Sequence, residues 1–221
     1  MKMNWIILLG LVIGSSPFAQ NSGLTSKTVD TGANRRDFEQ FKKTAKEYEP
    51  AASELGKMMS GVLSMVGVDN AVSISLTNNH QLDLTDPHWY IVDGKLDAPP
   101  PDVLRNNETM VITFERHPNS FWGGFRGTEG VLTYKMGNSY LVIVWSAVST
   151  STNRLLVKII NQDPNPGRNL EASTLFKTYK KEAWEAGDYG KWHFGTNTMI
   201  NCKFIAAMGN GDKAPLQVFL S

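Results

Sequence analysis

The chain has 221 residues, with 22 basic and 21 acidic side chains and a single cysteine, Cys202. A charge so nearly balanced, without a basic block, lacks the electrostatic footprint of a nucleic-acid-binding protein, and we expect no nucleic-acid partner. A lone cysteine excludes an intramolecular disulfide, so the fold must be held together by its core.

Sequence motifs for catalysis and metal binding are absent. The zincin, P-loop, nucleophile-elbow and EF-hand patterns do not occur in the sequence. The four histidines, His80, His88, His117 and His193, are scattered along the chain, as ordinary surface or core histidines are. We therefore expect a protein that is not an enzyme and that needs no cofactor and no metal.

The first 19 residues are typical of a secretory signal peptide. Lys2 precedes an apolar run over residues 5–13, and small residues follow up to Ala19. The run is too short for a bilayer-spanning helix, which needs about 20 apolar residues. We predict cleavage after Ala19, with Ser16 and Gln20 as alternative sites, and an uncleaved anchor is the alternative to cleavage. The expected localisation is therefore secreted.

Residues 20–36 form a polar stretch that is rich in Ser, Thr and Gly and has no apolar period. Such a composition is typical of a flexible segment or a pro-segment. It ends at Arg35 and Arg36, which form either a dibasic processing site or two solvated arginines at the start of a helix.

Residues 37–67 have the period of an amphipathic helical region, which Pro50 divides into two parts. The apolar face of the second part is formed by Leu55, Met58, Met59, Val62, Met65 and Val66. Its polar face carries Glu54, Lys57, Ser60 and Ser64. A helix of this kind either packs permanently on a core or exchanges that contact for lipid.

Residues 68–221 have the pattern of a mostly β domain. Residues 72–76 alternate apolar and polar side chains, which indicates a half-buried strand. Further strands are predicted at residues 88–92, 109–115, 130–134, 140–148, 155–160, 199–206 and 216–220. A helix is predicted at residues 169–184, with Leu170, Leu175, Phe176, Tyr179 and Ala183 spaced to pack on a sheet. Many short strands separated by turn signals favour a β-sandwich.

Four stretches of this domain follow one another in a characteristic order. They are residues 71–79, residues 127–136 with 140–146, residues 153–159 and residues 187–193. Together they resemble the actinoporins, the pore-forming cytolysins of sea anemones, and their actinoporin-like relatives. The resemblance implies a β-sandwich flanked by two α-helices. It also implies a toxin whose monomer docks on the bilayer of a target cell, forms a homo-oligomer and inserts its N-terminal helix to line a cation-permeable pore.

The resemblance also implies a place for the lipid head group. In the family, a serine after the central strand, a proline two residues later and a cluster of aromatic side chains hold the choline of sphingomyelin by cation–π attraction. Ser146 matches the serine, whereas Val148 replaces the proline. The candidate head-group residues of this chain are Ser146, Phe176, Tyr179, Lys180 and Lys181.

This chain departs from the family at several of these positions. Phe176 stands in place of a tyrosine, and Lys180 and Lys181 stand in place of two more. Asp93 and Glu129 also place carboxylates where the family has uncharged groups. The lysines favour an anionic lipid over sphingomyelin, or they form a solvated helix face.

An aromatic loop is the second candidate for membrane contact. Phe121, Trp122 and Phe125 are close together in sequence, and aromatic rings suit the interface between a bilayer and water. The alternative for these rings is burial in the sandwich.

A lectin-like lipid- or carbohydrate-binding module without pore formation is the alternative function. Fungal fruit-body lectins resemble actinoporins in fold but do not need the helix to perforate a membrane. A cytolysin relative that has lost lipid recognition is a third option.

Overall fold

The computed structural model describes residues 71–116, 127–148, 152–186, 193–209 and 213–221. The expected signal peptide, the polar stretch at residues 20–36 and the amphipathic region at residues 37–67 lie outside the described residues. What the structure describes is the domain that the sequence predicts to be mostly β, and its strands form two sheets.

The first sheet, called sheet A, has the strand order β3-β5-β1-β11-β10-β9. Its strands are β1 (Ala71–Asn78), β3 (Lys95–Leu96), β5 (Glu108–Glu115), β9 (His193–Asn197), β10 (Cys202–Met208) and β11 (Lys213–Leu220). The first and last of these strands pair in parallel at its centre, with Ile74 opposite Leu216. Every other pair in sheet A is antiparallel.

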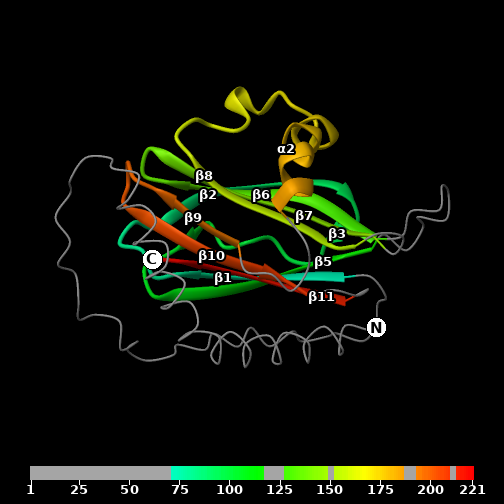
Figure 1. The fold of residues 1–221 in the computed structure, drawn as a ribbon, viewed down its shortest axis with the longest axis horizontal. Helices are drawn as coiled ribbons and strands as arrows, with labels where there is room; N and C mark the ends of the chain where they lie inside the picture. The colour runs from blue at the N-terminus through cyan, green and yellow to red at the C-terminus, as the bar shows by residue number, and fades with distance from the viewer. Residues whose placement is uncertain (1–70, 117–126, 149–151, 187–192, 210–212) are drawn as a thin grey trace, which may run out of the picture.

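The second sheet, sheet B, has the strand order β4-β2-β6-β7-β8 and is antiparallel throughout. Its strands are β2 (Leu84–Asp93), β4 (Val103–Leu104), β6 (Gly127–Met136), β7 (Ser139–Val148) and β8 (Arg154–Ile160). Figure 1 shows the two sheets as layers, with the helix α2 (Ala172–Ala186) on the outer side of sheet B.

The core between the sheets is built by side chains that alternate along the strands. On β1, Val72, Ile74 and Leu76 are fully buried and belong to the inter-sheet cluster. The rings of Phe114 and Trp145 meet across this core with centroids 4.2 Å apart. The predicted sandwich of two facing sheets is confirmed. Ser73 and Ser75 are also buried, so β1 is buried on both faces and not half-buried as its alternation predicts.

The helix α2 seals the other face of sheet B. A second apolar cluster contains Leu175, Phe176 and Tyr179 of the helix together with Val131, Val142, Val144 and Leu156 of the sheet. The predicted helix at residues 169–184 is therefore present, shifted by about one turn, but Leu170 precedes it and is exposed. Among the described residues α2 is the one α-helix, so the expectation of two flanking helices is not confirmed.

The eight predicted strands correspond to β1, β2, β5, β6, β7, β8, β10 and β11, whereas the two-residue strands β3 and β4 were not predicted. Sequence reasoning missed β9, and it extended the next strand back to Met199, which lies in the turn before β10. The Asn197 Oδ1 atom accepts the backbone N–H of Met199 at 3.0 Å, and this Asx contact favours a turn over a strand.

The single cysteine, Cys202, is fully buried at the start of β10, and burial raises the pKa of its thiol to about 12.

A close approach of backbone and ring requires the glycine at position 130. A Cβ atom added to Gly130 would lie 2.6 Å from the Trp145 ring, which packs over it. The indole Nε1 of Trp145 donates to Thr128 Oγ1 at 2.7 Å, which holds the ring in place.

We predict that Gly130→Ala lowers the free energy of unfolding by about 1–3 kcal/mol, because the extra methyl group overpacks this contact. Urea denaturation measures the change. Lys135→Ala, at an exposed site on the same strand, is the control and should change stability by less than about 0.5 kcal/mol. Equal stability of the two variants would contradict the packing argument.

His80 joins the loop after β1 to the turn before β10. Its Nε2 lies 3.1 Å from the carbonyl oxygen of Ile200, and its Nδ1 accepts the backbone N–H of Leu82 at 3.2 Å. The ring is neutral in this arrangement, because Nδ1 must keep its lone pair. Burial lowers the pKa of His80, and the hydrogen bond to Ile200 only partly opposes this effect.

We predict that neutral His80 contributes stability that is present above its unfolded pKa of about 6.5 and is lost as the pH falls through its lower folded pKa. The sign follows because the unfolded chain binds the proton more readily. Urea unfolding of the parent protein and His80→Gln between pH 7.5 and 5 measures the effect. The substitution should make the free energy of unfolding depend less on pH. Parallel plots of this free energy against pH for the two proteins would contradict the role given to His80.

Candidate functional site

The register of sheet B places three polar residues in one row. Ser146 on β7 pairs with Glu129 on β6 and with Arg154 on β8. Asp93 on β2 is also opposite Glu129, but a β-bulge between Ile91 and Asp93 interrupts the register there. Val142 and Val144 of β7 face α2, so Ser146, two residues further along, lies on the same face. The row therefore lies on the helix-covered face of sheet B, next to the apolar contact of α2.

Ser146 is held by the carboxylate beside it. Its side chain is 1% exposed, and its Oγ donates a hydrogen bond to Glu129 Oε1 at 2.6 Å. A hydrogen bond to a carboxylate is short and is roughly twice as strong as a neutral one. The hydroxyl proton of Ser146 is thus directed at Glu129.

Two of the candidate head-group residues on α2 are part of the core. Phe176 is 3% and Tyr179 is 8% exposed, and both belong to the apolar cluster under the helix. The ammonium group of exposed Lys180 lies 5.8 Å from the centroid of the Phe176 ring, within the range of a cation–π contact. These two rings therefore fix the helix to the sheet. The side chain of Lys181 lies outside the described residues.

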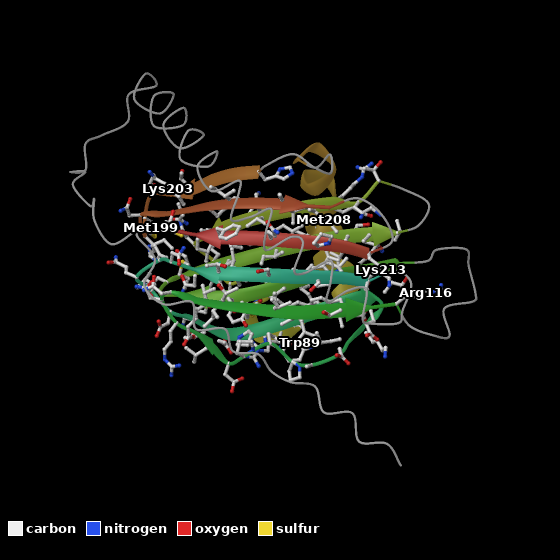
Figure 2. All side chains as sticks on the ribbon, turned by 90° about the horizontal axis from the view of Figure 1, so that it is seen from below. Trp89, Arg116, Met199, Lys203, Met208 and Lys213 are labelled. Carbon is white, nitrogen blue, oxygen red and sulfur yellow. The ribbon has the colours of Figure 1, made fainter. Side chains whose placement is uncertain are left out.

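The sandwich has two ends, which we name after the residues near them. At the Ser146 end β7 and β5 finish and β6 and β8 begin; at the His80 end β1 finishes and β7 and β10 begin. Figure 2 shows Arg116, Met208 and Lys213 at the first end, and Met199 and Lys203 at the other. The chain between β5 and β6 carries Phe121, Trp122 and Phe125. Its attachment points are thus at the Ser146 end, although these three residues lie outside the described ones.

The candidate pore-lining residues cannot be placed relative to this row. Leu55, Met58, Met59, Val62, Met65 and Val66 lie outside the described residues. The strand β1 begins at Ala71, so residues 37–67 are joined to the sandwich at the Ser146 end. Within the described part of the chain, no helix is both long and apolar enough to cross a bilayer.

A charged cluster near the other end was missed by the sequence analysis. Asp86 Oδ1 lies 3.2 Å from both His88 Nε2 and Arg168 Nη2, which ties β2 to the turn before α2. Both Asp86 and Arg168 have positive φ angles, 51° and 57°. Asp86 and His88 lie two residues apart on β2, but Arg168 is 82 residues away from Asp86, so no local pattern predicts that contact. They form one structural contact at the start of the helix.

A hollow of about 470 Å³ lies between the edge strands β8 and β9, and sequence reasoning missed it together with β9. It is lined by Leu156, Val157, Lys158, Ile159, Ile160, His193, Gly195, Thr196 and Phe204. Gly195 lies directly under the Phe204 ring, its partner across the strands. Across the described ranges, no three His, Cys, Asp or Glu side chains come together as a metal site would require.

The fold is similar to solved structures of low sequence identity. The crystal structure of the lipid-binding protein Nakanori matches with a TM-score of 0.61 at 14% identity, over 81% of this chain and 85% of that one. The Xerocomus chrysenteron lectin XCL matches with a TM-score of 0.44 at 12% identity, over 68% of this chain and 99% of the lectin. No protein-family model matches the chain, and no curated protein matches its sequence. The similarity to Nakanori shows a shared fold.

We predict that Phe176→Ala lowers the free energy of unfolding by about 3–5 kcal/mol, because it removes a buried ring. Lys180→Ala should cost about 1 kcal/mol or less, since its cation–π contact is exposed. Chemical denaturation of both variants measures the difference, with Lys177→Ala as the exposed control. A fully stable Phe176→Ala protein would show that the ring is not a structural anchor.

Proposed function

We propose that this protein is a secreted, membrane-binding cytolysin that oligomerises on target cells and forms a cation-permeable pore with residues 37–67. The carrying observation is the position of the amphipathic segment. It ends a few residues before β1, and the strands that follow build a sandwich whose inter-sheet core is filled by side chains from β1 to β11. The apolar face of the segment is thus not needed between the two sheets.

The fold supports a lipid-directed role. Nakanori, with which the chain shares its fold, is a lipid-binding protein. In this chain, several features that suit a bilayer surface are located at the Ser146 end. The attachment of residues 37–67, the attachment of the aromatic segment at residues 117–126, and the basic side chains of Arg116 and Lys213 are all at this end (Figure 2). Basic and aromatic groups both favour the membrane interface.

The energetics of insertion fit an amphipathic segment of this kind. Burial of apolar area is worth about 25 cal/mol per Å², whether the partner surface is protein or hydrocarbon. The free energy lost when the apolar face of the segment leaves a protein surface is therefore regained when that face enters lipid. In an oligomer, Glu54, Lys57, Ser60 and Ser64 would face the water of the pore.

We predict that the processed protein releases dye from lipid vesicles. The Val62→Asp variant should release no dye, although it should still sediment with the vesicles. A charge on the apolar face opposes burial in hydrocarbon. Ser60→Asp places the same charge on the polar face and is the matched control, which should still cause leakage. The assay compares phosphatidylcholine, sphingomyelin and anionic vesicles.

The outcomes of this assay separate the candidate functions. Absence of leakage from every composition would contradict pore formation. Binding without leakage by the parent protein and both variants would favour the lectin-like module instead. Leakage by Val62→Asp at the parent rate would show that another segment lines the pore.

A further inference from the structure

We propose that Asn107 is a site of N-linked glycosylation, and that its glycan lies at the end of the sandwich that faces away from the membrane. Asn107, Glu108 and Thr109 form a sequon, in which the middle residue is not proline. It is the one such sequon in the sequence. The modification rests on the secretion, and the orientation of the glycan rests on the membrane binding, that belong to the proposed function.

The sequon begins in the turn between β4 and β5, and the backbone of this turn is held on several sides. The N–H of Glu108 donates to the carbonyl oxygen of Arg105 at 3.1 Å, which closes a β-turn. The N–H of Arg105 donates back to Glu108 Oε2 at 2.7 Å. The N–H of Asn107 donates to the carbonyl oxygen of Asn78 at 2.6 Å. Asn107 has a φ of 64°, a conformation that asparagine tolerates better than most residues.

The side-chain amide of Asn107 is left free by this arrangement. Asn107 is exposed, and its side chain has no partner among the described residues. Other asparagines use their amides to hold the fold together. Asn78 Nδ2 donates to the carbonyl oxygen of Leu82 at 3.0 Å. Asn197 Nδ2 donates to the carbonyl oxygen of Ile159 at 3.2 Å. A glycan on Asn78 or Asn197 would break such bonds, whereas a glycan on Asn107 displaces nothing and can occupy the surface, as a bulky modification must.

The third residue of the sequon is at the surface as well. Thr109 is exposed on β5, and its Oγ1 lies 2.9 Å from Thr77 Oγ1 on the neighbouring strand β1. This contact between two hydroxyl groups is outside the inter-sheet core. Substitution of Thr109 therefore removes the sequon without removing a core side chain.

The reaction joins the amide nitrogen of Asn107 to a sugar. The donor is a polyprenyl-diphosphate-linked oligosaccharide, and the catalyst is the oligosaccharyl transferase of a secretory pathway. A bond forms between Nδ2 of Asn107 and C1 of the first sugar, while the bond from C1 to the diphosphate oxygen breaks. The diphosphate leaves with the bonding electron pair, and Nδ2 gives up one proton.

The sequon lies at the His80 end of the sandwich. Asn78, the last residue of β1, pairs with Glu108, the first residue of β5. Residues 37–67 and residues 117–126 are attached at the opposite ends of the same two strands. The strand β1 has 8 residues, which at about 3.3 Å per residue separates the two ends by roughly 26 Å. A hydrophilic glycan on Asn107 thus leaves the Ser146 end uncovered for a bilayer.

The experiment expresses the full chain in cultured mammalian cells and measures the mass of the protein in the medium before and after treatment with peptide N-glycosidase. We predict that the enzyme lowers the mass of the parent protein and converts Asn107 to aspartate. Asn107→Asp should be secreted without the glycan, and aspartate also tolerates the positive φ. Thr109→Ala should lose the glycan and Thr109→Ser should keep it. Asn106→Asp, the same change at the exposed neighbouring residue, is the matched control and should keep it too.

The other outcomes overturn the site in ways that can be told apart. A parent protein that reaches the medium with the mass of its polypeptide alone would overturn the site and leave secretion standing. A mass loss that persists in Asn107→Asp would overturn the assignment to Asn107. A chain that stays in the cells unglycosylated, with residues 1–19 still attached, would overturn secretion together with the site.

The orientation of the glycan is tested by sedimentation with phosphatidylcholine, sphingomyelin and anionic vesicles. The glycosylated parent and the same protein after treatment with peptide N-glycosidase should bind equally, because the glycan is at the far end from the bilayer. Weaker binding by the glycosylated form would overturn this orientation. Failure of both forms to bind any vesicle would overturn the membrane function and the orientation together, while the masses still decide the site.

Discussion

Burial of β7 on both of its faces is the constraint on which the rest of this structure depends. The odd-numbered side chains from Leu141 to Trp145 enter the core between the sheets, and the even-numbered Val142 and Val144 support α2. A strand buried on both faces must lie inside its sheet, and β6 and β8 pair with it on either side. The position of the helix and the register of the polar row both follow from this one strand.

The polar row interrupts this pattern at one place. Ser146 continues the face that Val142 and Val144 bury, and it is as inaccessible as they are. A buried hydroxyl without a partner is costly, and the neighbouring strand supplies an acceptor for Ser146. Here the acceptor is the carboxylate of Glu129.

Two aromatic residues of α2 that were expected to bind a lipid head group instead attach the helix to sheet B. The rings of Phe176 and Tyr179 are buried against sheet B, and Lys180 lies over the first of them. An aromatic ring whose faces are used by the protein has little left to offer a choline ammonium. Recognition of a lipid through an aromatic cage on this helix therefore conflicts with the packing of the helix.

The sequence by itself determined the elements whose patterns are local. The alternation at residues 72–76, the apolar run within residues 140–148 and the helical spacing of Leu175, Phe176 and Tyr179 each predicted the right element. Tertiary structure decided what pairs with what. The contact of Ser146 with Glu129 spans 17 residues of the chain, and the bridge from His80 to Ile200 spans 120. Local propensity is carried by neighbours in the chain, whereas register, burial and hydrogen-bond partners are fixed only when distant strands come together.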